Sequence, residues 1–423
     1  MVHWITDRLG TAPWGQIDDV SDLYCVDVRE LLDGRGNPAS AVKSKIDEAL
    51  HHLRQGQKVV VCCDYGISRS NSVVAGIIAM QDGITLDQAV RRVTAATGEG
   101  SLKLEVLSVV RKALGTDSPE TRSSDGNGPS ILITGASGFI GSALLPALGN
   151  GDDLVTPSHL DVDLIRDVVG LDLLVKKHGV NMILHLANPR VYTTNESMGT
   201  AMTMLKNVLD VCAENGLFLI YLSGWEIYSG YRTQQLKASS SLPAFPGGTY
   251  GQTKFLSEML VQHYERYRGV PSCILRSSPV YGAGSSRPKF IWNFLEKALN
   301  DQEIVTHKYL NGFPALDLLH VDDLVRAIVA AIKNRPRRAI NLGTGVGTST
   351  TEIARIIVER VKSRSRIRHL EIDAHVSNVI MDTADAAAML GWRPTISLIE
   401  GLENLIQLEQ PHRVRPTEAK REL

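Results

Sequence analysis

The stretch Ile131-Leu-Ile-Thr-Gly-Ala-Ser-Gly-Phe-Ile-Gly141 constrains the fold of this chain more than any other part of the sequence. Apolar residues typical of a buried parallel strand lead directly into Gly135, Gly138 and Gly141, and helix-forming residues follow. Glycines let such a turn close and let the backbone approach a pyrophosphate, while the free N–H groups of the helix N-terminus attract negative charge. The stretch therefore predicts a dinucleotide site on a parallel α/β sheet.

The whole composition excludes several classes of protein. The 423 residues carry 45 basic and 46 acidic side chains, so we expect neither a nucleic acid nor an anionic membrane as a partner. The chain has no apolar run of about eighteen residues, and its first residues lack the form of a signal peptide. The five cysteines have no metal-ligand spacing and form no disulfide framework, so we expect a cytoplasmic protein without a metal.

The dinucleotide turn begins far from the N-terminus, which predicts a separate domain before it. Residues 1–115 have an α/β pattern, with strands expected at 24–28 and 57–63 and helices at 41–53 and 72–80. Residues 116–129 are rich in Gly, Ser and Pro and are predicted to be a linker. The remaining predictions are a second domain over 130–412 and a solvated tail over 413–423.

The most informative stretch of the N-terminal segment is Val59-Val-Val-Cys-Cys-Asp-Tyr-Gly-Ile-Ser-Arg-Ser70. A buried strand ends at Cys63, five residues including Gly66 form a turn, and Arg69 leads into a helix. Successive backbone N–H groups, a helix N-terminus and a guanidinium together make a cradle for an anion. A cysteine in that positive field has a lowered pKa and is a nucleophilic thiolate.

These residues resemble the signature loop of the protein tyrosine phosphatase superfamily, and most closely its dual-specificity branch. The resemblance implies that Cys63 attacks phosphorus, that Arg69 holds the phosphoryl oxygens and that Ser70 helps the thiolate leave. It also implies a general acid upstream, for which Asp33 is the candidate and Asp27 the rival. Two departures oppose this chemistry, since Cys62 replaces the usual histidine and the acidic Asp64 lies inside the loop.

In the second half, a Tyr-x3-Lys pair follows the dinucleotide turn. Tyr250 and Lys254 lie on the same face of an expected helix, so the ammonium group is expected to lower the pKa of the phenol toward neutrality. Tyr250 could then act as an acid or base at a sugar hydroxyl or ketone. The second strand ends at Pro157-Ser158-His159, which carries neither the acid typical of NAD sites nor the base typical of NADP sites.

Many pieces of this half, in order, resemble the extended short-chain dehydrogenase/reductase family, which includes nucleotide-sugar epimerases and dehydratases. Besides the glycine turn and the Tyr-x3-Lys pair they include 184–187, 275–282, 319–324, 341–345 and 390–394. The resemblance implies a Rossmann-type doubly wound parallel sheet with a small C-terminal substrate lobe, and NAD as cofactor with NADP not excluded. The residues that would bind it are Gly135, Ser137, Gly138, Phe139, Ile140, Gly141, Asp161 (or Asp163), Ala187, Tyr250 and Lys254.

The catalytic hydroxyl of this family is missing, because Gly224 occupies its position. Ser223 either substitutes for it or has a structural role at the end of a strand. Glu226 lies where sugar dehydratases and decarboxylases keep a glutamate base, and the alternative is a solvated loop residue. His185 is expected to satisfy hydrogen bonds in the core, and Arg276 is a candidate contact for the substrate nucleotide.

These observations predict a bifunctional enzyme, with a cysteine-dependent phosphatase domain fused to an NAD(P)-dependent oxidoreductase or epimerase. The expected substrates are a phosphorylated sugar or a nucleotide-sugar, with a phosphoprotein as a further possibility and a homodimer implied by the family. An alternative is a protein phosphatase regulated by a non-catalytic NAD(P)-sensing domain, for which Gly224 is the main support. In a third reading, Cys62 and Asp64 leave only a phosphate-binding domain.

Overall fold

The computed structural model describes most of the chain, namely residues 2–17, 23–100, 102–116, 130–149, 153–233, 235–285 and 289–409. The predicted tail, the end of the second domain from residue 410, and the predicted linker apart from residue 116 lie outside this part. The chain forms two compact units. One comprises Met1–Ser130, His159–Asn181 and Lys206–Gly216, and the other comprises Ile131–Ser158, Met182–Leu205 and Leu217–Leu423.

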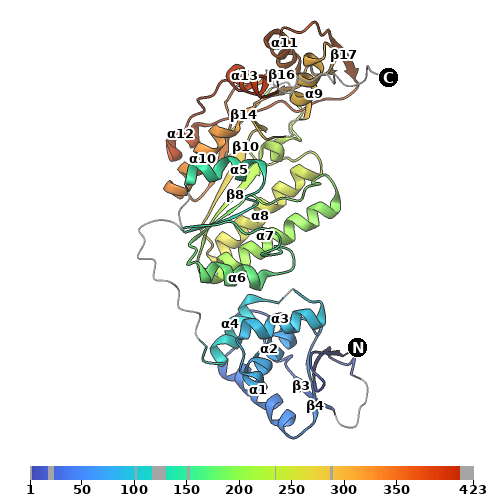
Figure 1. The fold of residues 1–423 in the computed structure, drawn as a ribbon, viewed down its shortest axis with the longest axis vertical. Coiled ribbons are helices and arrows are strands. Elements are labelled where there is room, and N and C mark those ends of the chain that lie inside the picture. Colours follow the sequence, from blue (N-terminus) through green and yellow to red (C-terminus); the bar gives the residue numbers. More distant parts are fainter. Residues whose placement is uncertain are drawn as a thin grey trace, which may run out of the picture. The chain divides into compact units, whose positions relative to one another are not determined.

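The N-terminal part of the first unit is an α/β structure built on a four-stranded sheet (Figure 1). The sheet order is β1-β2-β4-β3, and the pairing is parallel except between β1 and β2. The strands are β1 (His3–Trp4), β2 (Leu9–Pro13), β3 (Leu23–Asp27) and β4 (Lys58–Cys63). The helices are α1 (Ala39–Arg54), α2 (Arg69–Asp82), α3 (Leu86–Thr97) and α4 (Leu104–Ala113).

Local sequence explains where these helices begin and end. Thr85 and Gln88 form a capping box at the start of α3, and Gly83 and Gly98 end α2 and α3 in the left-handed conformation. The apolar side of α1 is buried at Val42, Ile46, Ala49, Leu50 and Leu53, as its periodicity predicts. Strand β4 is buried from Val59 onward, so the loop that follows Cys63 starts from a fixed point.

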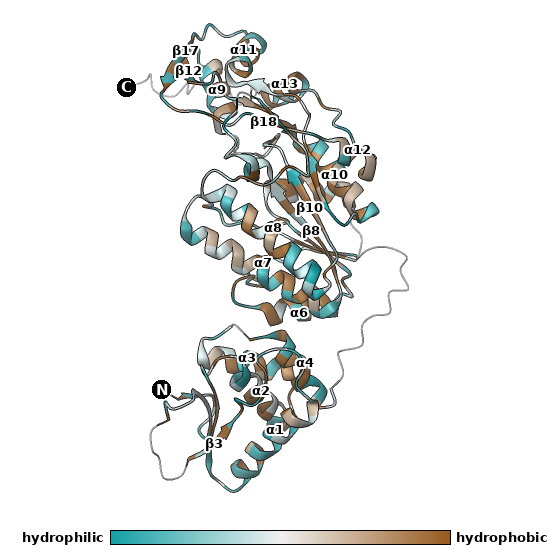
Figure 2. Ribbon diagram, turned by 180° about the vertical axis from the view of Figure 1, so that it is seen from behind, coloured by the Kyte–Doolittle hydropathy of each residue, from teal (hydrophilic) through white to brown (hydrophobic). Residues whose placement is uncertain are grey.

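The second unit contains a six-stranded parallel sheet in the order β15-β10-β8-β7-β5-β6. The strands are β5 (Ile131–Thr134), β6 (Leu154–Val155), β7 (Met182–His185), β8 (Phe218–Gly224), β10 (Ser272–Ser277) and β15 (Ala339–Leu342). In Figures 1 and 2, α8 (Thr249–Arg268) lies on one side of the sheet, and α5 (Phe139–Leu148) and α10 (Val321–Asn334) lie on the other. The strands are largely hydrophobic, whereas α8 carries both kinds of residue (Figure 2). The predicted α/β parallel sheet is confirmed.

The apolar core of this unit joins the sheet to α5, α10 and α12 (Ala384–Leu390). It includes Ile131 and Ile133 of β5 and the helix residues Leu144, Leu324 and Ile328. Chain order reverses at β5, since β6 follows it on one side and β7 on the other. Ligands of open parallel sheets bind at such a switch point, beyond the carboxyl ends of the strands. The fold therefore directs attention to the loops after β5, β7 and β8.

A smaller lobe with its own core follows. Its strand pairs are β11 (Val280–Tyr281) with β14 (Leu319–His320), β12 (Ile304–Tyr309) with β17 (Ile367–Ile372), β13 (Ala315–Leu316) with β16 (Thr348–Ser349), and β18 (Val379–Met381) with β9 (Leu236–Ala238). The helices that complete it are α9 (Lys289–Leu299), α11 (Thr350–Val361) and α13 (Leu398–Glu409). Elsewhere the chain forms η1 (Trp225–Tyr228), α6 (Val168–Lys177) and α7 (Asn195–Asn215).

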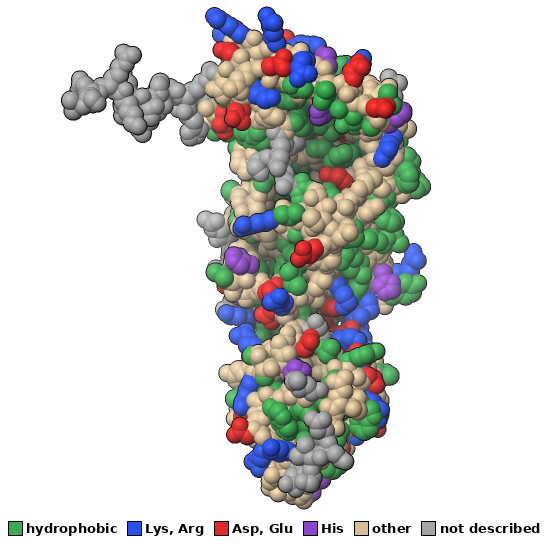
Figure 3. Space-filling model, turned by 90° about the vertical axis from the view of Figure 1, so that its right-hand side faces the viewer, with side chains coloured by type: hydrophobic (Ala, Val, Ile, Leu, Met, Phe, Trp, Pro, Cys, Tyr) green, Lys and Arg blue, Asp and Glu red, His purple; other side chains and the backbone are tan. Residues whose placement is uncertain are grey.

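Charges of both signs are interspersed on the face of the molecule that Figure 3 shows. Among the described residues, no helix is long and apolar enough to cross a membrane. The described residues also hold no group of three or more His, Cys, Asp or Glu side chains arranged to bind a metal ion.

Candidate functional site

The glycine turn after β5 lies between two cavities of the second unit. Gly135 has φ of 74°, and a Cβ there would lie 2.7 Å from the backbone nitrogen of Ala187, so the turn packs against the end of β7. A larger residue would separate these two segments. Gly138 caps the N-terminus of α5, and Gly141 has no room for a Cβ beside Ala136.

The first cavity, of about 790 Å³, is lined by Ala136, Ser137, Ser142, Leu145, Pro146, Gly149, Thr156, Pro157 and Ser158. The second, of about 840 Å³, receives Phe139 and Ile140 from the other end of the same turn. A long ligand with two ends, held at its centre by the helix N-terminus, fits this arrangement. Five of the predicted cofactor residues line the two cavities, namely Ser137, Phe139, Ile140, Tyr250 and Lys254, and the three glycines belong to the turn between them. Asp161 and Asp163 line neither of them and belong to the first unit, so the choice between them stays open.

The larger cavity brings together the loops after four strands and the first turn of α8. It is lined by Phe139, Ile140, Leu186, Asn188, Arg190, Val191, Tyr192, Thr193, Leu222, Ser223, Gly224, Trp225, Glu226, Tyr250, Lys254, Ser277, Ser278, Pro279, Val280, Ser285 and Leu316. Three of them, Glu226, Tyr250 and Lys254, are titratable candidates from the sequence. The tertiary structure therefore assembles the predicted chemistry in one place.

Lys254 is only 7% exposed and lies one turn after Tyr250. Its Nζ donates to the carbonyl of Leu222 at 2.9 Å and to the phenol of Tyr221 at 3.3 Å. The same Nζ lies 5.6 Å from the centre of the Tyr250 ring. Burial alone lowers the pKa of Lys254, but Tyr221, Tyr250 and Glu226 raise it overall, so the ammonium group stays charged.

The expectation of a phenol that titrates near neutral pH is wrong for the protein by itself. Burial raises the pKa of Tyr250 to about 12, because it outweighs the charge of Lys254. Glu226, Tyr221 and Tyr192 also raise it. Tyr192, which sequence reasoning missed, packs its ring 4.5 Å from that of Tyr250. Tyr250 is consequently a proton donor at neutral pH until a ligand changes its surroundings.

Glu226 fills the space left by the missing hydroxyl residue. A Cβ on Gly224 would collide with Glu226 Oε2. With a serine or threonine at position 224, the Glu226 carboxylate would therefore have to move from its present place. Burial raises the pKa of Glu226 to about 7, although its own backbone N–H and the Lys254 charge act in the opposite direction. A carboxyl group that titrates near neutral pH can both accept and return a proton.

Ser223 has a different use. Its hydroxyl donates to Glu258 Oε1 at 2.5 Å, and the Glu258 carboxylate is also bound by Arg276 at 2.7 Å. Both charged residues are buried, and Arg276 further donates to the Tyr228 phenol at 2.7 Å. The Ser223 hydroxyl is therefore engaged in a buried network, which supports its structural alternative. Arg276 is not free to contact a nucleotide, because its guanidinium neutralises Glu258.

His185 has the role expected of it. It is buried, and its Nδ1 lies 2.7 Å from Thr134 Oγ1 between neighbouring strands. Burial lowers the pKa of His185 to about 3, so the ring is neutral and serves packing.

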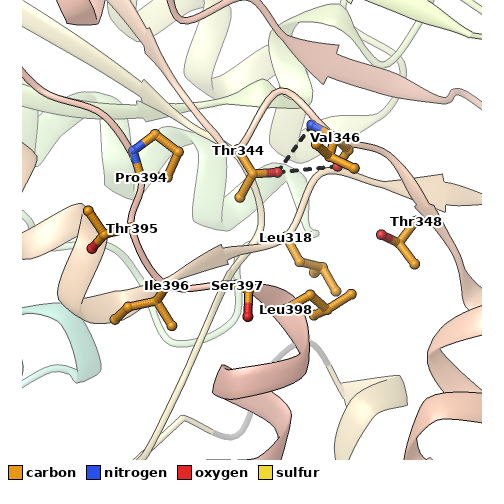
Figure 4. Close-up of a pocket in the computed structure, with 9 residues that line it drawn as sticks. All are labelled: Leu318, Thr344, Val346, Thr348, Pro394, Thr395, Ile396, Ser397 and Leu398. Atoms are coloured by element: carbon orange, nitrogen blue, oxygen red, sulfur yellow. Dashed lines mark hydrogen bonds between the residues drawn. The ribbon is translucent and has the colours of Figure 1, made fainter.

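A third cavity, of about 390 Å³, lies in the small lobe (Figure 4). It is lined by Leu318, Thr344, Val346, Thr348, Pro394, Thr395, Ile396, Ser397 and Leu398, none of which is charged. Thr344 turns its hydroxyl toward the backbone of Val346 and also bonds Asp317 at 2.6 Å. The cavity offers hydroxyls and apolar surface but no acid or base.

In the first unit, the loop from Cys63 to Arg69 connects buried β4 to α2. Gly66 has φ of 68°, and a Cβ there would lie 2.6 Å from the Pro13 nitrogen, which explains why glycine is needed at this point. Ser70 Oγ lies 3.4 Å from the Cys63 sulfur. Burial raises the pKa of the Cys63 thiol, but Ser70 and the N–H groups of Ser70, Tyr65 and Ile67 lower it overall. These groups therefore stabilise the Cys63 thiolate, and binding of a phosphate by the loop stays a prediction.

The other candidate phosphatase residues are bound to groups of the protein itself. Arg69 donates to the carbonyls of Arg29 and Leu31 at 3.1 and 3.0 Å, and its other terminal nitrogen bonds the carboxylate of Asp64. Asp33 lies near the loop and forms an ion pair with Lys103 at 2.6 Å.

Burial raises the pKa of Asp33, but Lys103, Ser68 and Arg69 lower it overall, so in this state it is a carboxylate rather than the acid expected of it. Asp27, its rival, ends β3 and forms an ion pair with Arg29. Cys62, in place of the usual histidine, is buried and packs against Cys25.

Residues 131–343 match the model of the NAD dependent epimerase/dehydratase family. A Bacillus subtilis protein described as an uncharacterized UDP-glucose epimerase, YtcB, is 27% identical over 312 residues, which are 65% of this chain and 96% of that protein.

Two solved structures share the fold. The UDP-glucose 4-epimerase of Thermotoga maritima with UDP-glucose has a TM-score of 0.59 and 23% identity, covering 67% of this chain and 99% of its own. The Thermus thermophilus UDP-glucose 4-epimerase in complex with NAD has a TM-score of 0.57 and 20% identity, and the match covers 66% of this chain and 97% of that one.

Proposed function

This chain belongs to the NAD-dependent epimerase/dehydratase family, and we propose that its second unit oxidises and remodels the sugar of a nucleotide-sugar with NAD as cofactor. The family match and the NAD complexes of structurally similar proteins support the cofactor. The residues present fit it, because the glycine turn and the α5 N-terminus lie between two cavities. The nucleotide-sugar substrate is proposed from similar proteins, one described as a UDP-glucose epimerase and one solved with UDP-glucose.

The residues of the larger cavity have distinct roles in this reaction. When bound, NAD accepts and returns a hydride at a sugar carbon. Oxidation of the sugar hydroxyl needs Tyr250 as a phenolate, so its phenol must first give up its proton; the phenolate then takes the hydroxyl proton and returns it on reduction, and the Lys254 ammonium group stabilises it. Hydrogen bonds to the Tyr221 phenol and the Leu222 carbonyl of β8 hold the Lys254 side chain in place, which keeps its positive charge beside Tyr250.

Glu226 carries the proposal, because its carboxyl lies where the hydroxyl residue is missing and titrates near neutral pH. We assign it the role of a second proton carrier beside Tyr250. After oxidation of the sugar, the C–H bond next to the new carbonyl becomes acidic, and a carboxylate in the cavity can remove that proton. This favours a dehydratase-like or enolising reaction over simple inversion at one carbon.

The test incubates the full chain with NAD and UDP-glucose, dTDP-glucose or UDP-glucuronic acid in deuterated water, followed by mass spectrometry of the sugar. Turnover with deuterium at the carbon next to the oxidised one is expected, and Glu226→Gln should lower it by about 100-fold or more. Glu359→Gln, at an exposed glutamate of α11, is the control. Turnover of unchanged rate in Glu226→Gln would exclude the role of this carboxyl.

A second activity is favoured by the loop around Cys63. Three backbone N–H groups and the Ser70 hydroxyl stabilise the thiolate of Cys63, as nucleophilic attack on a phosphate ester requires. Because Lys103 holds Asp33 as a carboxylate, the leaving group gains no proton from it. We therefore propose hydrolysis of phosphomonoesters with good leaving groups, such as aryl phosphates, through a phosphocysteine.

Release of phosphate from p-nitrophenyl phosphate tests this second activity. Cys63→Ser should abolish it, whereas Cys25→Ser should not. If both variants behave like the wild type, or if the wild type is inactive, the loop at most binds phosphate. Adding NADH to the same assay separates the bifunctional proposal from the sensor alternative, because a sensor would change phosphate release without turning over any sugar.

A further inference from the structure

Two cysteines of the first unit lie in contact on neighbouring strands. Cys25 of β3 and Cys62 of β4 have their sulfur atoms 3.1 Å apart. The strands are parallel, and the register pairs Cys25 with Val60 and Asp27 with Cys62, so the two cysteines are diagonal neighbours on one sheet face. Both belong to the small apolar cluster that Ala12 and Val60 form there.

The strand geometry suits a covalent bond. Diagonal neighbours on adjacent strands have Cα atoms about 7–8 Å apart, at the upper limit for a disulfide, and here the two sulfur atoms are already in contact at 3.1 Å. To reach the roughly 2 Å of a disulfide, the sulfurs must approach by roughly 1 Å, which side-chain rotation together with a small shift of the two strands provides. No break of the β3–β4 pairing is needed, because both residues keep their places in the ladder.

The two thiols differ in access. Cys62 is fully buried, whereas Cys25 is partly exposed, so a reagent from solvent reaches Cys25 first. The contact between the two sulfurs lowers the pKa of Cys25 and raises that of Cys62, so Cys25 is the more reactive thiol of the pair. Cys63 follows Cys62 in the strand, its side chain therefore points to the opposite face, and its sulfur contacts Ser70. The pair is thus separate from the proposed nucleophile.

We propose that Cys25 and Cys62 form a reversible disulfide when the protein meets a small disulfide oxidant such as oxidised glutathione. The Cys25 thiolate attacks one glutathione sulfur, forms a mixed disulfide and releases a glutathione thiolate. The Cys62 thiol then loses its proton and attacks the Cys25 sulfur, which forms the intramolecular bond and releases the second glutathione, protonated, as leaving group. Two electrons pass from the two cysteines to the oxidant.

The bond would tie β3 to β4 at the residue before Cys63, which fixes the strand end that carries the anion-binding loop. It consumes neither Cys63 nor any residue of the cavity in the second unit. The inference is therefore independent of both proposed activities.

The test oxidises the full-length Cys63→Ser protein with oxidised glutathione, blocks free thiols with iodoacetamide and digests with trypsin. Peptides 9–29 and 59–69 should appear joined, lighter than their sum by two hydrogens, and should separate after reduction with dithiothreitol. The wild type should lose the same two thiols.

In a Cys62→Ser, Cys63→Ser protein, the expected product is a lasting glutathione adduct on Cys25, which shows that Cys62 is the residue that resolves this adduct. A lasting adduct on Cys25 in the Cys63→Ser protein, without the cross-link, would overturn the proposal. The same conclusion would follow if both cysteines stayed fully open to iodoacetamide after oxidation. Circular dichroism of each variant verifies that the protein is folded.

Discussion

The Cys63 loop and the dinucleotide turn are built on the same plan but differ in where their charges are satisfied. In each, a buried parallel strand ends in a glycine turn that opens a helix, β4 to α2 in one and β5 to α5 in the other. In the first, Arg69 is bonded to Asp64 of the same loop and Asp33 to Lys103. In the second, Lys254 and Glu226 line a cavity of about 840 Å³.

This difference teaches how ready each site is for a ligand. A ligand of the Cys63 loop must displace a carboxylate from the arginine, so part of its binding energy is spent on breaking an existing ion pair. A ligand of the larger cavity instead meets charged groups that already face it, so its binding energy can go to the reaction. Four changes test the comparison.

The largest effect is expected from Tyr250→Phe, which removes the proton carrier of the cavity but keeps its ring. Turnover of the sugar substrate should fall by about 1,000-fold, measured as product by mass spectrometry. Binding of NADH, followed by its fluorescence, should change little. Tyr267→Phe, at an exposed tyrosine of the same helix, should keep full activity. A Tyr250→Phe protein with activity within tenfold of the wild type would contradict the proposed role.

Glu226→Gln should stabilise the protein at high pH. The folded protein raises the pKa of this carboxyl from its ordinary 4.5 to about 7, so its favourable contribution is complete below about pH 4.5 and is lost as pH rises through 7. At pH 8 the free energy of unfolding of the glutamine variant should exceed that of the wild type by up to about 2 kcal/mol, and at pH 5 by much less. Thermal unfolding at both pH values measures this, with Glu359→Gln as the control. An equal gain at both would contradict the burial argument.

Asp64→Ala should free Arg69 for phosphate. Because Asp64 is 53% exposed, a gain of about three- to tenfold in kcat/KM for aryl phosphates is expected, together with stronger inhibition by inorganic phosphate. Asp47, which is 52% exposed and paired with Lys43, gives a matched control as Asp47→Ala. Lower activity in Asp64→Ala would mean that the ion pair positions Arg69 for phosphate binding and does not compete with the phosphate.

The smallest effect is expected from Ser70→Ala. Loss of the hydroxyl that lies 3.4 Å from the Cys63 sulfur removes one of the groups that lower the thiol pKa. The pH profile for alkylation of Cys63 by iodoacetamide should therefore move upward, with a rate loss below about tenfold at pH 7. Ser72→Ala, whose hydroxyl bonds the Ser68 carbonyl, should leave the profile unchanged.

Sequence reasoning recovered the parts of each site that depend on short-range pattern. The strand, turn and helix at 131–148 and the strand, loop and helix at 58–82 follow from apolar runs and glycines that act within a few residues. The same is true of Tyr250 and Lys254, because one helical turn places them on one face. It missed Tyr192, since nothing in a loop sequence indicates that its ring packs against Tyr250.

The errors concern residues whose partners lie far along the chain. Arg276 looked available for a nucleotide until Glu258 was found to neutralise it, and Asp33 looked like an acid until Lys103 was found beside it. The pKa of Tyr250 was expected to fall because only Lys254 was considered, whereas burial by the whole cavity wall raises it. Each outcome depends on desolvation and on side chains from other elements, which periodicity does not report.

By itself, the sequence determined that this chain contains a parallel α/β sheet with a dinucleotide turn, a cysteine at the end of a buried strand before a glycine-containing loop, and a tyrosine one turn before a lysine. Only the tertiary structure decided that Glu226 fills the place left empty at Gly224 and that Cys25 touches Cys62. The reason is physical. Backbone propensity acts over a few residues, whereas the protonation and partners of a side chain are set by atoms that folding brings within a few ångströms.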